Sequence, residues 1–245
     1  SIVYPLEGHN GIFGPDDVQG AIRSGSLHAP RSRLVVIEQT SNLGGGAVWP
    51  LKQLEAVSRV ARDHDLSLHM DGARLMNAVV AAGVSAANFS ATVDSVWLDL
   101  SKGLGCPVGA VLSGSREFIH EAWRWKHRIG GAMRQAGIVA AAGSWALKHH
   151  VDRLAEDHEN AQLLAKRISA LDGVTLVNEK VETNMVFFDV SKTPLSAAEI
   201  SARLREKGIW IGPFGEQKMR AVTHLDVRRE DIIETSDALA DILVH

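Results

Sequence analysis

Short apolar runs alternate with stretches of helical periodicity through the first two thirds of the chain, and this alternation constrains the fold most. Residues 34–38 (LVVIE) form an apolar run that ends in an acid, which is typical of a strand covered on both faces. From Pro50 onward, leucine and valine recur along one face of a predicted helix. Further strand-like runs occupy residues 66–70, 93–100 and 108–112. Strands that alternate with helices predict an α/β protein with a mostly parallel sheet and helices on both faces.

The pattern changes toward the C-terminus. Residues 131–170 are rich in alanine and predict an almost wholly helical stretch. Beyond it, the SAAE segment that starts at Ser196 has the spacing of a capping box and predicts a helix that Gly208 can close. Strand candidates follow at residues 174–177, 184–190 and 219–227, and a last helix is predicted at residues 229–243. We therefore predict two units, a large domain at residues 1–150 and a small C-terminal α/β domain at residues 151–245.

Composition and charge exclude several classes of protein. A chain of 245 residues with 45% hydrophobic content can bury a sizeable core, and its net charge of -3 gives no basic face for nucleic acid. No apolar run approaches the ~20 residues needed to span a membrane, and the first residues lack the pattern of a signal peptide. Cys106 is the only cysteine, so we expect no internal disulfide and a cytoplasmic setting. The histidines show no metal-like spacing, so we expect no metal site.

Polar side chains follow three of the predicted strands. Asn42, Asp71 and Lys102 each lie where a strand gives way to a loop, and ligands of parallel sheets collect at that edge. Gly103 and Gly105 would let a ligand approach Lys102 closely, and partial burial would favour its neutral, nucleophilic amine. Taken singly, these residues have plainer interpretations: a solvated loop lysine, and an aspartate that caps a turn or pairs with a nearby arginine.

Three segments are much more specific in combination: LHMDGARLMNA at 68–78, SKGLGCPVGAVLSG at 101–114 and RWKHRIGGAMRQAGIVAAAG at 124–143. In this order and at this spacing they resemble the threonine aldolase family of fold-type I enzymes, which depend on pyridoxal 5′-phosphate. EQTSN at 38–42 and VTHLD at 222–226 extend the resemblance over essentially the whole chain. The resemblance implies a fold-type I large domain, followed by a smaller C-terminal domain.

The resemblance also implies which residues bind the cofactor. Lys102, preceded by Ser101, matches the lysine that bonds covalently to the cofactor's aldehyde. Asp71 matches the acid that keeps the pyridinium nitrogen protonated, so that the ring can accept electrons. Arg134 matches a basic residue of the cofactor pocket that would serve the phosphate, across a subunit boundary in a homo-oligomer (a dimer or tetramer).

Two further arginines are implied to bind the substrate. Arg74 matches an arginine near the cofactor's 3-hydroxyl and the substrate, and Arg220 matches the arginine that binds the amino-acid carboxylate through its planar fork. The implied reaction cleaves a β-hydroxy-α-amino acid (threonine, allo-threonine or phenylserine) to glycine and an aldehyde. The alternatives are another fold-type I enzyme, such as a β-eliminating lyase or an aminotransferase, and a non-catalytic fragment.

The chain departs from the family pattern at several positions. Ser41, His127 and Ala132 stand where relatives have a histidine, a lysine and a glycine. The resemblance also implies a segment ahead of Ser1 that carries a phosphate loop and a histidine stacked on the cofactor ring. We therefore expect residues 1–245 alone not to be a competent aldolase.

Overall fold

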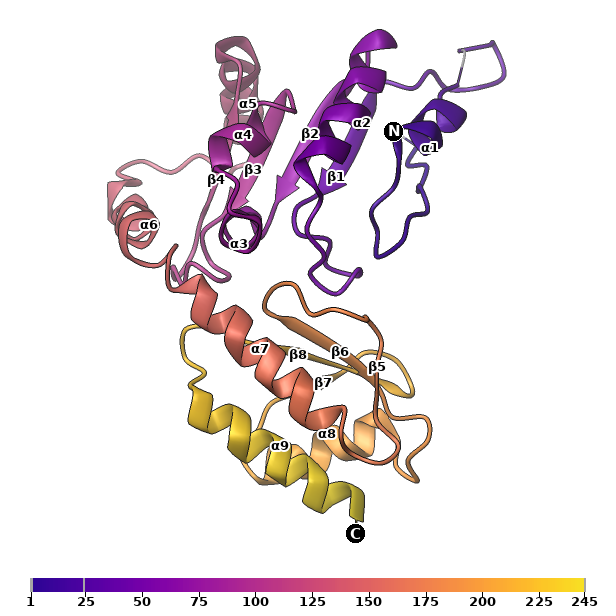
Figure 1. Cartoon of the computed structure of the whole chain (residues 1–245). Helices are drawn as coiled ribbons and strands as arrows, with labels where there is room; N and C mark the ends of the chain where they lie inside the picture. The colour runs from indigo at the N-terminus through magenta and orange to yellow at the C-terminus, as the bar shows by residue number, and fades with distance from the viewer. Residues whose placement is uncertain (1, 24, 245) are drawn as a thin grey trace.

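The computed structural model of the chain describes residues 2–23 and 25–244, and it contains two sheets with their helices (Figure 1). The elements of the first part are α1 (Pro15–Ala21), β1 (Leu34–Glu38), α2 (Leu51–Asp63), β2 (Ser67–Gly72), α3 (Leu75–Ala82), α4 (Ala86–Ser90), β3 (Ser95–Asp99), β4 (Ala110–Gly114), α5 (Arg116–Arg128) and α6 (Gly137–His149). The elements of the second part are α7 (Leu154–Ile168), β5 (Thr175–Leu176), β6 (Met185–Asp189), α8 (Ala197–Glu206), β7 (Gly212–Pro213), β8 (Lys218–Val222) and α9 (Arg229–Val244).

The first sheet has the strand order β1-β2-β3-β4, in which β1, β2 and β3 are parallel and β4 is antiparallel to β3. The mostly parallel α/β sheet predicted from the sequence is confirmed. β2 continues through Asp71 to Gly72, two residues beyond its predicted end. β4 starts at Ala110 instead of Val108, because Gly109 has a φ of 122° and interrupts the extended backbone.

Only one face of β1 is covered within the described chain. Val35 and Ile37 are buried in a core that includes Leu54 of α2, whereas Leu34 and Val36 on the opposite face are 55% and 50% exposed. The prediction that this strand is covered on both faces was therefore wrong for the described residues. A run of apolar side chains shows that a strand can be buried, but not what packs against each face.

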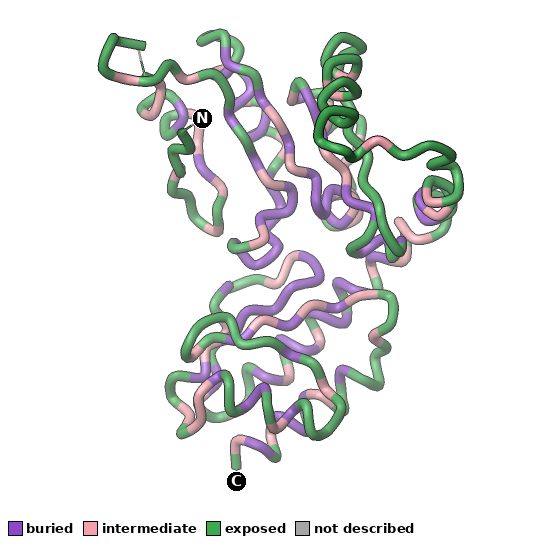
Figure 2. The backbone as a smooth tube through the Cα atoms, turned by 180° about the vertical axis from the view of Figure 1, so that it is seen from behind, coloured by how far each residue is buried: buried purple, intermediate pink, exposed green. Residues whose placement is uncertain are grey.

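The edge of the sheet around β4 and α5 is also exposed. All residues of β4 are exposed, and α5 buries none of its residues in this chain (Figure 2). Trp123 and Trp125 of α5 are 50% and 58% exposed. The stretch predicted to be almost wholly helical, residues 131–170, contains α6 and α7, with non-helical turns before α6 and between the two helices.

The second sheet is wholly antiparallel, in the order β5-β6-β8-β7. The predicted capping box is present: the Ser196 hydroxyl accepts from the Glu199 N–H and starts α8. Gly208 follows α8 with a φ of 80°, as predicted. The strand predicted at residues 219–227 ends at Val222, because the chain turns where the Val227 N–H donates to the His224 carbonyl.

Each sheet has its own hydrophobic core. Side chains of α7, α8 and α9 pack against alternate residues of the second sheet, including Val186, Phe188, Met219 and Ala221. The core of the first sheet is a separate cluster of buried side chains from β1, β2, β3 and α2. Two cores agree with a two-domain organisation, and the boundary at residue 150 stays a prediction.

Glycines in the loop after β1 hold the two sheets together. The Asn178 side chain donates to the Gly44 carbonyl at 3.0 Å, and the Thr183 hydroxyl donates to the Gly46 carbonyl at 2.8 Å. Gly46 has a φ of 79°, and a Cβ there would lie 2.3 Å from the Thr183 hydroxyl oxygen. Glycine is therefore needed for this approach, which sets the second sheet against the carboxyl end of β1.

Candidate active site

Three acids lie at the carboxyl ends of three neighbouring parallel strands: Glu38 on β1, Asp71 on β2 and Asp99 on β3. Glu38 is in register with Asp71, and Asp71 is in register with Trp97, two residues before Asp99. Because side chains alternate along a strand, and residues such as Ile37 face the core, all three acids lie on the opposite face of the sheet. The carboxyl edge of this face is therefore acidic.

Lys102 lies at the same edge. Its Nζ is 2.9 Å from the Asp99 Oδ2 and 5.2 Å from the centre of the Trp97 ring. The loop that carries it is tightly folded, since the Gly105 N–H donates to the Lys102 carbonyl at 2.9 Å. Gly105 has a φ of 71°, and a Cβ there would lie 2.2 Å from a methyl group of Leu225. The predicted lysine thus stands over the strand end in a defined position, with its side chain 39% exposed.

Asp71 is half-buried at the same sheet edge, where it is in register with Trp97. Its Oδ1 accepts from the Ala73 N–H at 3.0 Å, so it does cap the turn after β2, as the plainer interpretation proposed. It forms no salt bridge with Arg74 within the described chain. One bond to the turn leaves the second carboxylate oxygen available to a ligand.

Arg74 at the start of α3 and Arg220 on β8 are close enough for their charges to interact. Burial lowers the pKa of Arg74, the nearby charge of Arg220 lowers it further, and Glu38, Asp99 and Asp71 oppose the change. The Nε atoms of both arginines are buried without a hydrogen-bond partner among the described residues. Two neighbouring guanidinium groups with free donors form a site that suits an anion.

The second sheet supplies Arg220 because of its alternation. Met219 and Ala221, on either side of Arg220, point into the core, so Arg220 points from the other face of β8. Its guanidinium carbon lies 5.9 Å from the ring centre of Phe187, its partner in β6. The link through Gly46 and Thr183 therefore brings Arg220 toward the carboxyl end of the first sheet.

Arg134 is not brought into this cluster. It lies exposed between α5 and α6, and it forms no salt bridge or side-chain hydrogen bond with another described residue. His127, at the end of α5, is exposed as well. The proposed phosphate role of Arg134 thus gains no support from contacts within this chain.

Sequence reasoning missed Asp99. The residue is 8% exposed, and its carboxylate contacts Lys102 and accepts a hydrogen bond from the N–H of Ser101. A signal was present, because Asp99 ends a predicted strand just as Glu38 and Asp71 do, and it stands three residues before Lys102. Asn42, which sequence reasoning did note, lies close to Arg74, with its Oδ1 3.5 Å from the guanidinium.

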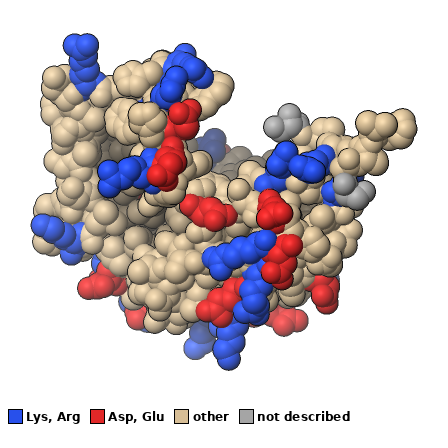
Figure 3. Space-filling model, turned by 90° about the horizontal axis from the view of Figure 1, so that it is seen from above, with Lys and Arg blue, Asp and Glu red and all other residues tan. Residues whose placement is uncertain are grey.

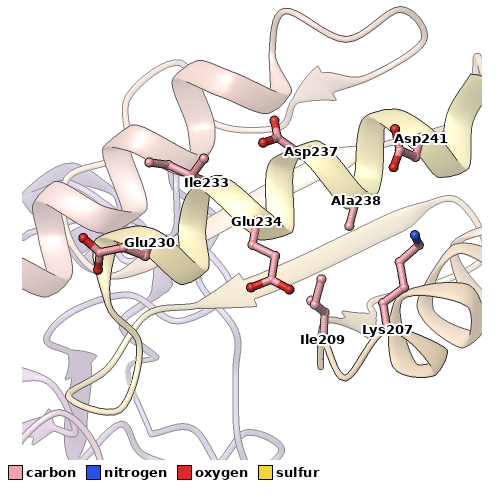
Figure 4. A pocket seen from close by; sticks show the side chains of 8 residues that line it. All are labelled: Lys207, Ile209, Glu230, Ile233, Glu234, Asp237, Ala238 and Asp241. Atoms are coloured by element: carbon pink, nitrogen blue, oxygen red, sulfur yellow. The ribbon is translucent and has the colours of Figure 1, made fainter.

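The remaining surface offers less to an anionic ligand. A groove between α8 and α9 has four carboxylates and one ammonium in its lining (Figure 4), formed by Lys207, Ile209, Glu230, Ile233, Glu234, Asp237, Ala238 and Asp241. The excess of negative charge disfavours phosphate or carboxylate there. On the face seen from above, acidic and basic side chains are interspersed (Figure 3). Among residues 2–23 and 25–244, no helix is both long and apolar enough to cross a membrane.

The mixed sheet, the lysine loop at its edge and the antiparallel C-terminal layer define a fold-type I protein, the α/β class of pyridoxal-phosphate enzymes. The same fold occurs in Leishmania major threonine aldolase, with a TM-score of 0.79 and 19% identity over 96% of this chain and 69% of that one. A mutant of Thermus thermophilus aspartate aminotransferase has it too, with a TM-score of 0.68 and 20% identity over 96% and 64%. The chain belongs to the beta-eliminating lyase family, whose family model matches residues 1–192.

Several curated relatives of the chain are low-specificity L-threonine aldolases. The chain is 39% identical to a low specificity L-threonine aldolase of Escherichia coli K12, over 93% of this chain and 65% of the relative. It is 36% identical to low-specificity L-threonine aldolase 1 of Arabidopsis thaliana, over 91% and 63%. The chain thus spans less than two thirds of the length of these relatives.

Membership of this family and fold implies the use of pyridoxal 5′-phosphate. The residues present fit such a group in part: a loop amine at the strand end, a half-buried carboxylate with a free oxygen, and two guanidinium groups with unpartnered Nε atoms. An aldehyde, a ring nitrogen and a carboxylate each find a complementary group here. The groups named above are all side chains, and none of them is a set of backbone N–H groups that would bind a phosphate.

Proposed function

We propose that the protein is a pyridoxal-phosphate-dependent lyase that cleaves a β-hydroxy-α-amino acid to glycine and an aldehyde. The observation that carries the proposal is the position of the Lys102 amine, at the same sheet edge as Asp71 and within one cluster with Arg74. The relatives that are named L-threonine aldolases, at 36–39% identity, support this choice of reaction. Threonine, allo-threonine and phenylserine are the proposed substrates.

The cofactor would be held by side chains at the carboxyl end of the first sheet. Lys102 would bond to its aldehyde, Ser101 would lie beside it, and Asp71 would hold a proton at the ring nitrogen. Arg134 is proposed to bind the phosphate. Because it lies outside the cluster of the other site residues, another chain or segment would have to complete the phosphate site. When bound, the cofactor supplies an electron-withdrawing ring that stabilises the charge left when the Cα–Cβ bond breaks.

Arg220 and Arg74 are proposed to bind the substrate. A carboxylate between the two guanidinium groups would satisfy the buried Nε atoms and offset the repulsion that lowers the pKa of Arg74. Because Arg220 comes from the second sheet and Arg74 from the first, the carboxylate would bridge the two parts of the chain. This fixes the orientation of the substrate relative to Lys102.

The first test is chemical labelling of the lysine. Reduction of the cofactor-loaded protein with borohydride, followed by peptide mapping, should place a pyridoxyl group on Lys102. Lys192 is the matched control, since it occurs in the same Asp-x-Ser-Lys sequence at the end of β6. A label on another lysine would refute the assignment of Lys102.

The second test identifies the reaction. Incubation with threonine and with phenylserine should release glycine and the corresponding aldehyde. The family that the chain belongs to also favours a second candidate, a β-eliminating lyase, which would release ammonia and a keto acid instead. Transfer of the amino group to an added oxo acid would indicate an aminotransferase.

We also propose that the protein is a homo-oligomer, a dimer or a tetramer. The support comes from large apolar side chains of α5, α6 and the turn between them, of which Trp125, Ile129 and Trp145 are 58%, 77% and 56% exposed. Exposed apolar surface of this kind is typical of contact between subunits. Sedimentation of the purified protein should show one species larger than the monomer, and a monomer alone would contradict the proposal.

A further inference from the structure

Asp99 divides its two carboxylate oxygens between the turn and the lysine. Its Oδ1 accepts from both the N–H and the hydroxyl of Ser101, each at 2.7 Å. Its Oδ2 lies 2.9 Å from the Lys102 Nζ. With a side chain only 8% exposed, Asp99 cannot turn toward solvent without breaking the two bonds to Ser101. The carboxylate therefore presents one fixed oxygen to the amine.

The surroundings keep this carboxylate charged. Burial raises the pKa of Asp99, but hydrogen bonds from Ser101 and Lys102 and the charge of Lys102 outweigh it, so the net change is downward. The charged or titratable groups that interact with Asp99 are Arg74 at the start of α3, and Lys102 and Cys106 of its own loop. Burial raises the pKa of the Cys106 thiol, and the charge of Asp99 raises it further, so this thiol stays neutral.

We propose that Asp99 is a positioning residue for Lys102. It holds the Lys102 ammonium above the Trp97 ring by a charged hydrogen bond, and so limits how readily this amine reacts with an electrophile. The inference rests on the proposed function only in taking Lys102 as the cofactor lysine. An amine held in this way is oriented by the fixed carboxylate oxygen at the sheet edge.

A second copy of the motif shows that spacing alone does not make this pair. Asp189, Ser191 and Lys192 repeat the Asp-x-Ser-Lys sequence at the end of β6, and the Asp189 Oδ1 accepts from the Ser191 N–H at 2.8 Å. Lys192 is exposed and forms no salt bridge with Asp189 within the described chain. The sequence spacing alone is therefore not sufficient for the Asp99–Lys102 contact, and Lys192 provides an internal control.

The experiment measures how fast each lysine is acylated in the cofactor-free protein. An amine-reactive reagent is added over a series of pH values, and mass spectrometry of peptides reads Lys102 and Lys192 separately. In Asp99→Asn the Asn oxygen can still accept both bonds from Ser101, while the charge beside Lys102 is lost. We expect acylation of Lys102 at neutral pH to increase roughly tenfold. This is the low end of the effect of removing an opposite charge from within about 4 Å, and the low end applies because the amine is partly exposed.

Two further variants complete the test. Asp99→Glu keeps the charge on a longer side chain and should increase labelling of Lys102 by less than Asp99→Asn. Asp189→Asn should leave the labelling of Lys102 unchanged. An increase confined to Lys102 supports the proposal. Unchanged labelling of Lys102, or an increase shared by Lys192, would overturn it. Since neither cofactor nor substrate is present, the result does not depend on whether the protein is an aldolase.

Discussion

Acid should lower the free energy of unfolding through His158, a histidine that connects the two parts of the chain. His158 lies on α7 and is buried, and its Nε2 is 3.1 Å from the Nδ2 of Asn77 on α3. The amide nitrogen can only donate, so Nε2 must accept and the ring must be neutral. Burial lowers the pKa of His158 from 6.5 to about 4.

The sign of the pH effect follows from these two values. Above pH 6.5 the ring is neutral in both states, and titration of His158 costs nothing. As the pH falls, the unfolded chain takes up a proton at pH 6.5, whereas the folded protein does so only near pH 4. Between pH 7 and pH 5 this difference should lower the free energy of unfolding by about 2 kcal/mol. Below pH 4 the loss from this residue should level off.

The assay compares urea unfolding of the protein and of His158→Gln at pH 7 and pH 5. Glutamine can place an oxygen near Nε2 to accept from Asn77, but it does not titrate. Every other titrating group is the same in both proteins, so the variant should lose about 2 kcal/mol less on acidification. An equal loss in both proteins would show that His158 is protonated in the folded state, and would refute the argument.

Substitutions at three further positions, with one control, test other parts of the structure. Asp71→Asn should lower turnover roughly tenfold to hundredfold, because a charged hydrogen bond of about 1.5–3 kcal/mol is lost, and should change cofactor binding little in an absorbance titration. Normal turnover would leave Asp71 as a turn cap only. Arg220→Ala should raise the Michaelis constant strongly, and Arg220→Lys should restore part of the loss; unchanged kinetics in both would move the carboxylate to another group. Gly46→Ala should lower the stability to urea by more than about 1–2 kcal/mol, because strain at positive φ adds to a clash with Thr183. Gly83→Ala, at a φ of 63° with no atom within 4 Å of the added Cβ, should show the strain alone, and equal losses would refute the clash.

The fold could be predicted from the sequence where the signal is local. The apolar run of β1 and the capping box of α8 at Ser196 depend on neighbouring residues, and both were found at their predicted positions. The exposure of Val36 could not be predicted, because it depends on which segment packs against that face. The start of β4 was misplaced by the conformation of Gly109, which glycine permits but does not require.

The candidate site divides in the same way. Lys102 and Asp71 could be predicted as neighbours, because each follows a parallel strand and such ends meet at one edge of the sheet. The proximity of Arg220 to Arg74 depends on the packing of one sheet against the other, and only the family resemblance suggested it. Asp99 was missed because an acid at the end of a strand can serve several structural roles. Only the folded structure shows that its side chain contacts Lys102.

The glycine link between the two sheets also has a consequence for the order of folding. Its hydrogen bonds, from Asn178 to Gly44 and from Thr183 to Gly46, join residues 134 and 137 positions apart. Closing so long a segment costs more chain entropy than pairing neighbouring strands, so we expect each sheet to form before the two dock. During synthesis, Lys102 would then reach its place while Arg220 is still unmade. The part of the site that holds Lys102 would form before the part that holds Arg220, the proposed substrate-binding residue.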